Sequence, residues 1–261
     1  MRKRSLALCR RVSGFLVLLG AALPCSPLRA AHPLITEDTG TLGAGRFQLE
    51  LANEHTSSRQ GGFEQYTVLT NTLLTYGLTA NTDVILSLPY LRLGASSLSG
   101  KPGADGFTDS GLDVKWRFYE EGRLSMAVKP GVTFPTGDEG RGLGTGKYTW
   151  SLYTVASYNP APWTFHLHLG HLHHNNTFNE RVNIWHASAA VAREMSDALR
   201  LILDTGIDTN TDTAARSHPA FMIAGLIWTP GKDMDLDLGY KLVSDDRTRS
   251  RSLLAGLTLR W

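Results

Sequence analysis

Apolar and polar residues alternate along much of the chain after residue 31. In residues 112–119, Leu112, Val114, Trp116 and Phe118 fall on one side of an extended segment, and three of the four residues on the other side are charged. Successive side chains of a β-strand point to opposite faces, so this period of two predicts a strand with one apolar and one charged face. The same period recurs in residues 234–242 and 253–261. Segments with the helical period are scarce, so the predicted fold class is all-β.

Twelve strands result when the chain is divided at turn residues and at breaks in the alternation. The connections after the even-numbered strands are about four or five residues long, as in tight hairpins, and those after the odd-numbered strands are about nine to eighteen residues long. Short turns that alternate with long polar or glycine-rich loops are typical of an antiparallel transmembrane β-barrel. The expected strands begin near Arg46, Gln65, Asp83, Leu112, Leu124, Tyr148, Trp163, Ile184, Leu199, Pro219, Met234 and Ser252.

A soluble sandwich or a lipocalin-like barrel would also alternate apolar and polar residues. Here charged residues oppose the apolar band in many strands, which indicates that the apolar face contacts lipid and the charged face lines a lumen. Aromatic residues near both strand ends are typical of the two interfacial belts of a membrane barrel. Those expected at the turn end are Tyr76, Phe118, Tyr158, Trp163, Trp228 and Trp261, and those at the loop end are Tyr90, Phe134, Trp150, Trp185, Phe221 and Tyr240.

The first thirty residues have the order of a secretory signal peptide. Five basic residues within residues 2–11 precede the apolar run of residues 12–24, and a small residue, Ala30, ends the segment. The apolar run is shorter than the roughly 20 residues that a membrane-spanning helix needs. We therefore expect cleavage after Ala30, which leaves residues 31–261 as the barrel domain.

Cleavage would change the composition of the protein. Residues 1–30 hold six of the 26 Lys and Arg, none of the 24 Asp and Glu, and both cysteines, Cys9 and Cys25, so the net charge falls from +2 to −4. The exported chain would contain no disulfide and no cysteine metal site. Its negative charge argues against a nucleic-acid partner.

Three segments resemble the outer-membrane family labelled as the MetA pathway of phenol degradation. They are HPLITEDTGTLGAGRFQLEL (residues 32–51), LLTYGLTANTDVILSLPY (residues 73–90) and KPGVTFPTGDEGRGLG (residues 129–144), and the likeness covers nearly all of the exported chain. The last residues, LLAGLTLRW, resemble the C-terminal assembly signal of outer-membrane barrels, with Trp261 in place of the usual Phe. The resemblance implies a location in the outer membrane of a Gram-negative bacterium and contact with its assembly machinery through the last strand. It also implies a channel or transporter for small molecules, with aromatic or other hydrophobic compounds as candidates.

Charged residues on the polar face are the expected lining of the lumen. Their signs balance, which gives no reason to expect strong ion selectivity, and they could either pair across strands or line a polar path. A lumen of twelve strands is intermediate between a filled and an open one, so we expect a narrow or gated pore. The expected lining residues are Glu50, Asp83, Asp113, Lys115, Arg117, Lys129, Arg200, Asp204, Asp235, Asp237, Lys241 and Arg260.

Other motifs suggest less specific chemistry. His166 and His168 share one strand face and are candidate metal ligands, but the pattern lacks a third ligand, and we expect neither a metal nor a cofactor. The glycine-rich residues 137–148 do not match a phosphate-binding loop. His186 and Ser188 also share one face and could belong to a hydrolase, although no specific active-site motif is present.

The sequence therefore predicts an outer-membrane β-barrel that passes small molecules passively and is not an enzyme. Its expected partners are membrane lipid, a small-molecule solute and the barrel assembly machinery. Two alternatives remain, a closed barrel with a structural or interaction role and an outer-membrane hydrolase. The identity of the solute, the oligomeric state and the openness of the lumen do not follow from the sequence.

Overall fold

The computed structural model describes residues 32–60, 63–94 and 103–261. The predicted signal peptide, residues 1–30, lies outside the described residues, as do Cys9 and Cys25. No helix in the described part of the chain is long and apolar enough to cross a membrane. The strands are β1 (Phe47–Gln60), β2 (Phe63–Gly77), β3 (Thr82–Leu93), β4 (Ala104–Phe107), β5 (Ser110–Glu121), β6 (Leu124–Phe134), β7 (Thr149–Tyr158), β8 (Trp163–His173), β9 (Asn183–Ser196), β10 (Leu199–Asp208), β11 (Ala220–Gly231), β12 (Met234–Ser244) and β13 (Thr248–Arg260).

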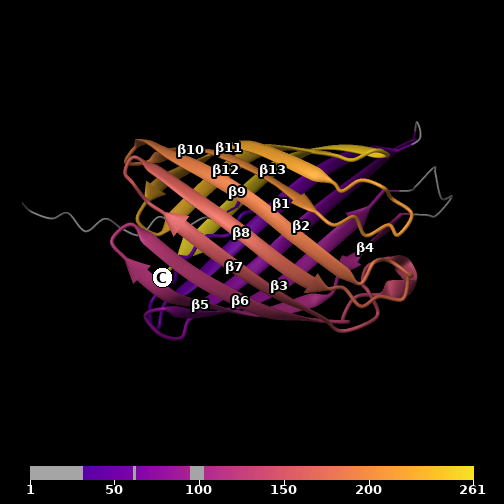
Figure 1. Cartoon of the computed structure of the whole chain (residues 1–261), viewed down its shortest axis with the longest axis horizontal. Coiled ribbons are helices and arrows are strands. Elements are labelled where there is room, and N and C mark those ends of the chain that lie inside the picture. The colour runs from indigo at the N-terminus through magenta and orange to yellow at the C-terminus, as the bar shows by residue number, and fades with distance from the viewer. Residues whose placement is uncertain (1–31, 61–62, 95–102) are drawn as a thin grey trace, which may run out of the picture.

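The strands form one antiparallel sheet that closes on itself (Figure 1). β1 pairs with both β2 and β13, β2 also pairs with β3, and the remaining barrel strands pair in chain order. The short β4 lies beside β3 at one rim, so the barrel itself has twelve strands. Closure satisfies the backbone hydrogen bonds of every barrel strand, as a hydrocarbon environment requires. The predicted twelve-stranded barrel is confirmed.

The two ends of the barrel differ, and we call them the turn end and the loop end. At the turn end, strands are joined through residues 78–81, 122–123, 159–162, 197–198 and 232–233. The two termini of the sheet also meet there, because the backbone N–H of Phe47 donates to Trp261 at 2.9 Å. The loop end carries the longer connections, among them the one that contains β4 and the one that contains the short 3-10 helix η1 (Glu139–Arg141).

Two of the predicted long loops are wrong. β1 continues to Gln60 and β2 begins at Phe63, while only residues 245–247 separate β12 from β13. Polar side chains pair across these extensions: Ser58 and Ser250 lie 2.9 Å apart, and Arg59 bonds to Glu64 at 2.8 Å. Because both faces are polar there, the alternation that reveals a strand is lost although the backbone ladder continues.

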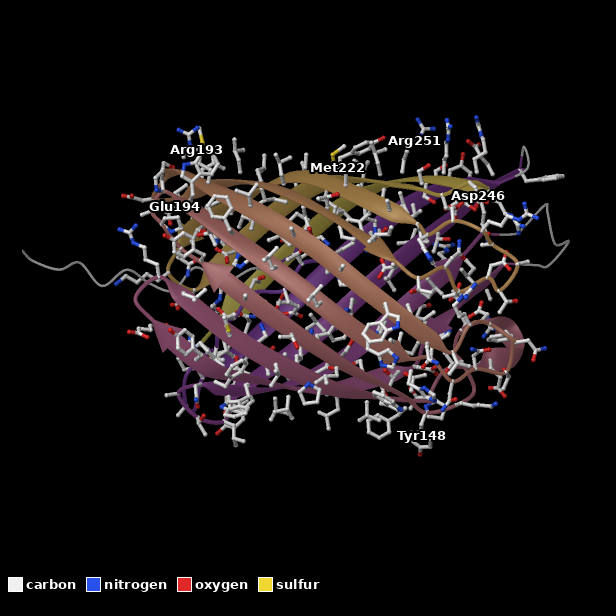
Figure 2. The ribbon with its side chains drawn as sticks, viewed as in Figure 1. Tyr148, Arg193, Glu194, Met222, Asp246 and Arg251 are labelled. Atoms are coloured by element: carbon white, nitrogen blue, oxygen red, sulfur yellow. The ribbon has the colours of Figure 1, made fainter. Side chains whose placement is uncertain are left out.

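The outward face of the barrel is apolar. On β10, Leu201 and Leu203 point outward and are 45% and 54% exposed, whereas Ile202 and Asp204 point inward and are buried. Figure 2 shows Met222 on the outer face between the rims, with Arg193 and Glu194 toward the turn end and Arg251 and Asp246 toward the loop end. An apolar band flanked by charged rims matches the cross-section of a bilayer.

Aromatic side chains gather at both rims, as expected. Trp163, Trp228 and Trp261 are exposed at the turn end, and Trp150 and Trp185 are exposed near the loop end. The expected position of Phe221 is wrong, because its ring is 4% exposed and points into the lumen. It belongs to an apolar cluster that fills one side of the interior, formed by Ala192, Ile202, Phe221, Ile223, Ile227 and Leu254.

Candidate functional site

Residues 32–46 enter the lumen from the turn end and leave it again before β1 begins. We call them the N-terminal segment. It starts beside β12, where His32 Nδ1 lies 2.6 Å from Asp237 Oδ1, and it ends near β3, where the Leu42 N–H donates to Asp83 at 2.9 Å. Between these points it reaches the middle of β10 at Asp204. The segment therefore forms a loop within the turn-end half of the barrel.

Glycines on the wall make room for the first part of this segment. Gly225 of β11 and Gly239 of β12 are register partners, and a Cβ atom on either would come within 3.0 Å of Pro33. The next residue, Leu34, packs against the apolar cluster that contains Phe221. The apolar side of the lumen thus acts as a packing surface for the N-terminal segment, rather than as an apolar passage.

Asp204 holds the apex of the segment, residues 35–37. Its carboxylate accepts the backbone N–H groups of Ile35 at 2.7 Å and Thr36 at 2.9 Å, and the Thr36 hydroxyl at 2.5 Å. A carboxylate that accepts several donors fixes their geometry strongly, because bonds to a charged acceptor are about twice as strong as neutral ones. Asp204 is therefore an anchor of the segment.

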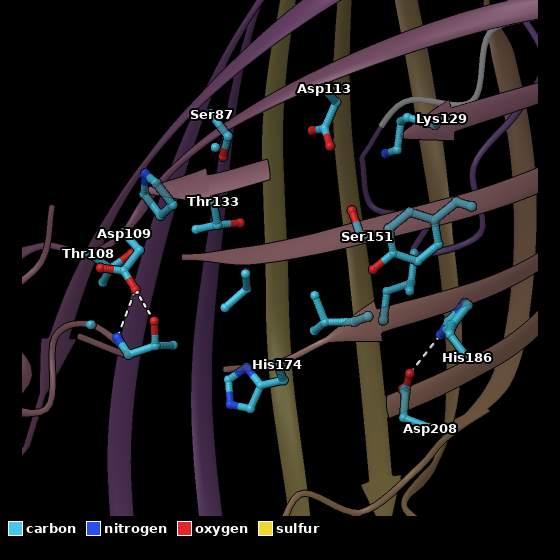
Figure 3. A pocket seen from close by; sticks show the side chains of 18 of the residues that line it. Ser87, Thr108, Asp109, Asp113, Lys129, Thr133, Ser151, His174, His186 and Asp208 are labelled. Carbon is cyan, nitrogen blue, oxygen red and sulfur yellow. Dashed lines mark hydrogen bonds and ion pairs between the residues drawn. The ribbon is translucent and has the colours of Figure 1, made fainter. Parts of the chain in front are cut away.

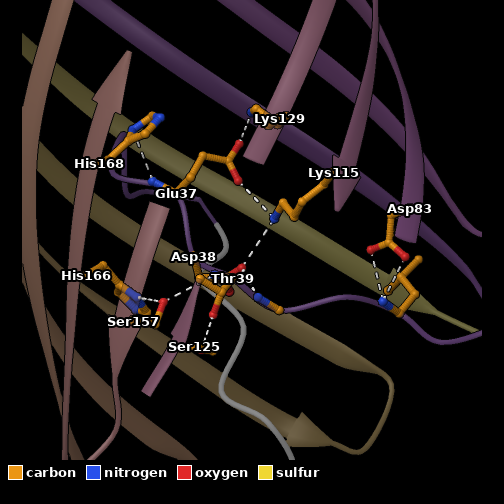
Figure 4. A network of polar contacts seen from close by, with 12 residues as sticks. Glu37, Asp38, Thr39, Asp83, Lys115, Ser125, Lys129, Ser157, His166 and His168 are labelled. Carbon is orange, nitrogen blue, oxygen red and sulfur yellow. Dashed lines mark hydrogen bonds and ion pairs between the residues drawn. The ribbon is translucent and has the colours of Figure 1, made fainter. Parts of the chain in front are cut away.

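The returning part of the segment is bonded to the neighbouring wall (Figure 4). The Thr39 hydroxyl lies 2.5 Å from the Ser125 hydroxyl, and the Thr39 N–H donates to Ser157 at 3.2 Å. Ser157 in turn lies 2.8 Å from His166 Nδ1. These contacts, together with Asp204, tie the segment to β6, β7 and β10.

Two acidic residues of the segment pair with two wall lysines. Glu37 forms ion pairs with Lys115, at 3.0 Å, and with Lys129. Asp38 lies 3.3 Å from the same Lys115 ammonium group. Burial alone would raise the pKa of the Glu37 carboxyl, but the two ammonium groups outweigh burial and hold the pKa below its usual range. Glu37 is thus ionised at neutral pH.

Two cavities lie along the described part of the lumen. The larger has a volume of about 760 Å³, and Figure 3 shows Asp109, Asp113, Lys129, His186 and Asp208 around it. It extends to the loop-end residues of β3, β6, β7 and β10. The smaller, about 220 Å³, lies between the N-terminal segment and the wall formed by β1, β2, β3 and β5. In the turn-end half of the barrel, the open space therefore lies beside β1, β2, β3 and β5, away from Ser125, Ser157 and Asp204.

The two cavities share four lining residues, Ile35, Glu37, Asp113 and Lys129. We call this set the waist. Two of its members belong to the apex of the segment, and the other two lie on β5 and β6. Any route along the lumen between the two cavities passes these side chains, so the waist is the candidate functional site.

The sequence-predicted lining residues all lie on the inward face of their strands. Asp113 and Lys129 belong to the waist, and Glu50, Asp83 and Lys115 line the smaller cavity. Others form ion pairs in the wall: Arg260 with Asp235 at 2.7 Å, Arg200 with Asp235 at 3.7 Å, and Lys241 with Glu54 at 2.6 Å. The remaining ones contact the turn end or the segment: Arg117 pairs with Glu120, Asp237 contacts His32, and Asp204 is the apex anchor.

The histidine-rich strand β8 does not assemble a metal site in the described part of the chain. His166 is bonded to Ser157, and His168 packs against Tyr153 and His186 with ring centroids 4.9 Å and 4.7 Å away. No group of three or more His, Cys, Asp or Glu side chains among the described residues is placed to hold a metal ion. Their observed contacts are those of polar packing beneath the segment.

His186 lies between a carboxylate and a serine. Its Nδ1 is 2.7 Å from Asp208 and its Nε2 is 2.8 Å from the Ser188 hydroxyl, which is the atom order of a Ser-His-Asp triad. The Ser188 oxygen also lies 2.7 Å from the Thr36 hydroxyl. The apex of the N-terminal segment thus contacts the serine, which is 8% exposed.

The Thr36 hydroxyl has one proton and two acceptors within hydrogen-bond distance. Its oxygen lies 2.5 Å from Asp204 Oδ1 and 2.7 Å from the Ser188 oxygen. When Nδ1 of His186 donates to Asp208, the other ring nitrogen, Nε2, can accept from the serine. The atom order of a triad is therefore present, and the feature that separates it from an open active site is the burial of the serine in contact with Thr36.

Sequence reasoning missed the N-terminal segment as part of the site. Thr36, Glu37 and Asp38 lie in residues with neither strand nor helix periodicity, and their partners are far away in the sequence. The one available signal was charge complementarity. Two adjacent acidic residues precede the first strand, and the lumen was expected to contain lysines with which they could pair.

Residues 33–261 match the model of the family described as "Putative MetA-pathway of phenol degradation". The chain belongs to this family. The resemblance stated from its sequence segments is confirmed, and this family member has no significant match among curated protein sequences.

Solved structures share the fold of this family member at low sequence identity. The COG4313 outer membrane channel from Pseudomonas putida F1 is similar with a TM-score of 0.72 and 14% identity, over 86% of this chain and 98% of that one. The NanC porin has a TM-score of 0.54 and 9% identity, over 80% and 98% of the two chains. The translocator domain of the autotransporter NalP from Neisseria meningitidis has a TM-score of 0.51 and 12% identity, over 85% and 91%. These matches establish the architecture of an outer-membrane β-barrel.

Proposed function

We propose that the protein is an outer-membrane channel that passes small solutes passively along its lumen. The observation that carries the proposal is the waist, where a cavity toward the loop end and a cavity beside the N-terminal segment share the same four side chains. The apolar outer face with aromatic residues at both rims supports a membrane location. The match to an outer membrane channel in fold supports the same proposal.

The solute class follows in part from the family. The family description refers to phenol degradation, so small aromatic compounds are the first solutes to test. The route itself is polar at the waist, where Glu37, Asp113 and Lys129 face the passage. A solute would therefore need to be small and able to pass charged groups. The last strand, which ends beside Trp261, is the proposed contact with the assembly machinery of the outer membrane.

Reconstitution in planar bilayers tests the proposal. We expect discrete conductance steps in KCl, and uptake of small aromatic solutes by liposomes that contain the protein. Barrel insertion is checked independently by the shift in gel mobility between heated and unheated samples. Inserted, folded protein without conductance or solute flux would contradict the channel and favour a closed structural barrel.

The arrangement of Ser188, His186 and Asp208 favours hydrolysis as the second candidate function. We propose instead that these residues anchor the segment, because Thr36 contacts the serine and the serine is only 8% exposed. A fluorophosphonate probe, which labels activated serines, distinguishes the two roles. We expect no labelling in the native protein, whereas labelling that is lost in Ser188→Ala would establish the hydrolase.

A further inference from the structure

The N-terminal segment changes the charge balance of the lumen. It contributes Glu37 and Asp38, and residues 32–45 contain neither Lys nor Arg. The described wall adds further acidic side chains on the inward face, such as Glu54 and Asp208, beyond those that the sequence pattern singled out. Acidic residues therefore outnumber the basic residues of the described lumen, and the balance expected from the strands alone is lost.

The basic groups of the lumen are already engaged by carboxylates. Lys115 contacts both Glu37 and Asp38, and Lys129 contacts Glu37. Lys241 pairs with Glu54, and Arg260 pairs with Asp235. A cation held within 4 Å of a carboxylate presents little net charge to a passing solute. The electric field that a solute meets in the passage is therefore set by carboxylates that have no ion-pair partner.

Asp113 is such a carboxylate, and it lies at the waist. Its side chain forms no hydrogen bond and no ion pair with any described residue, and it lines both cavities. Gly131 of β6 is its register partner, and a Cβ atom there would overlap an oxygen of the Asp113 carboxylate. The glycine thus leaves the space that this carboxylate occupies. Figure 3 shows Asp113 projecting into the larger cavity, on the side across from His186 and Asp208.

We propose that the waist selects for cations and that Asp113 is the residue that determines this selectivity. The inference rests on the proposed channel function and specifies its substrate class as small cations and amines, with inorganic and organic anions disfavoured. A carboxylate that faces a narrow passage attracts cations and raises the barrier for anions, in the way that acidic rings act in cation channels. Lys115 and Lys129 also act on Asp113, but their two positive charges are matched by the two negative charges of Glu37 and Asp38, so the charge of Asp113 remains as the excess.

The test is the reversal potential of single channels in a KCl gradient. We expect the native protein to favour K⁺ over Cl⁻ by about threefold or more, because a carboxylate at a narrow passage attracts cations and repels anions. Asp113→Asn keeps the shape of the side chain and should bring this ratio close to one, and Asp113→Lys should invert it. Asp246→Asn, at the exposed loop end, is the matched control and should leave the ratio unchanged.

The possible outcomes distinguish cation selectivity from the channel function on which it rests. Channels that open with a ratio of one or below in the native protein would overturn cation selectivity while leaving the channel intact. A ratio that responds equally to the Asp113 and Asp246 substitutions would overturn the role of Asp113. Absence of conductance in folded, inserted protein would overturn the channel itself and the selectivity with it.

Discussion

The two sides of the turn-end lumen are built from the same kind of wall and are used differently. On the side of β6, β7 and β10, the N-terminal segment is bonded to Ser125, Ser157 and Asp204 and fills the interior. On the side of β1, β2 and β3, a cavity of about 220 Å³ remains beside the segment. The narrow part of this barrel is therefore set by residues that precede the first strand, and strand number alone does not determine it.

The largest expected effect comes from removing the part of the N-terminal segment that fills one side of the lumen. In a variant whose exported chain begins at Gly43, the apex and its ion pairs are gone and the two cavities become one. We expect the single-channel conductance to rise by about threefold, because a pore conducts according to its narrowest part. Removal of residues 213 and 214, in the loop between β10 and β11, is the control. Unchanged conductance in the truncated protein would show that the segment does not narrow the route.

The assignment of the outer face to lipid and the inner face to the lumen is tested by placing a charged residue on the outer face. Leu203 points outward from β10 and is 54% exposed, next to the inward Asp204. Leu203→Arg should lower the free energy of unfolding in lipid by about 2–4 kcal/mol, as for arginine near the middle of a bilayer. Leu203→Met should have little effect. Reversible urea unfolding in vesicles measures both, and equal stability of the two variants would place this face away from lipid.

A smaller effect is expected from loosening the apex. Asp204→Ala leaves the Ile35 and Thr36 N–H groups without their acceptor, at a cost of about 1–3 kcal/mol for lost bonds to a buried charge. Amide exchange at these two positions should speed up by about tenfold or more. The control variant Asp212→Asn, in an exposed loop, should leave the rate of amide exchange at these positions unchanged. Equal exchange in all three proteins would mean that Asp204 does not anchor the segment.

The smallest effect concerns pH. The pKa of Glu37 lies below that of an unfolded carboxyl, so its ion pairs contribute stability above the unfolded pKa, and that contribution is lost only as pH falls through the lowered value. The stability difference between the native protein and Glu37→Gln should therefore be constant from about pH 7 to pH 5, a window above the ordinary carboxyl pKa. Urea unfolding at several pH values measures this difference. A difference that disappears within that window would show that Glu37 is not held by its lysines.

The sequence predicts the wall of this barrel well because each strand residue alternates between lipid and lumen. Leu112 and Asp113 fall on opposite faces by position alone, and the strand order follows from the antiparallel connections. Strand extensions such as Arg59 were missed, since polar residues on both faces hide the period. Phe221 was misplaced because an aromatic ring near a strand end can pack in a lumen as well as at an interface.

The site was harder to predict than the wall. The contact between Thr36 and Asp204 joins residues separated by 168 positions, and the N-terminal segment has no regular structure that a local pattern could reveal. The role of His186 and Ser188 was equally inaccessible, because spacing shows that two side chains share a face and does not show that a third, Thr36, contacts one of them.

The most direct test of the central claim compares accessibility on the two sides of the lumen. The native cysteines, Cys9 and Cys25, lie in the predicted signal peptide, so single cysteines can be introduced into the exported chain at Asn71, which lines the smaller cavity, and at Ser157, which the segment covers. A small cationic methanethiosulfonate reagent added to open channels should modify Asn71→Cys and reduce its current, and leave Ser157→Cys unmodified. Faster modification at position 157 than at position 71 would contradict a route that runs beside the N-terminal segment along β1, β2 and β3.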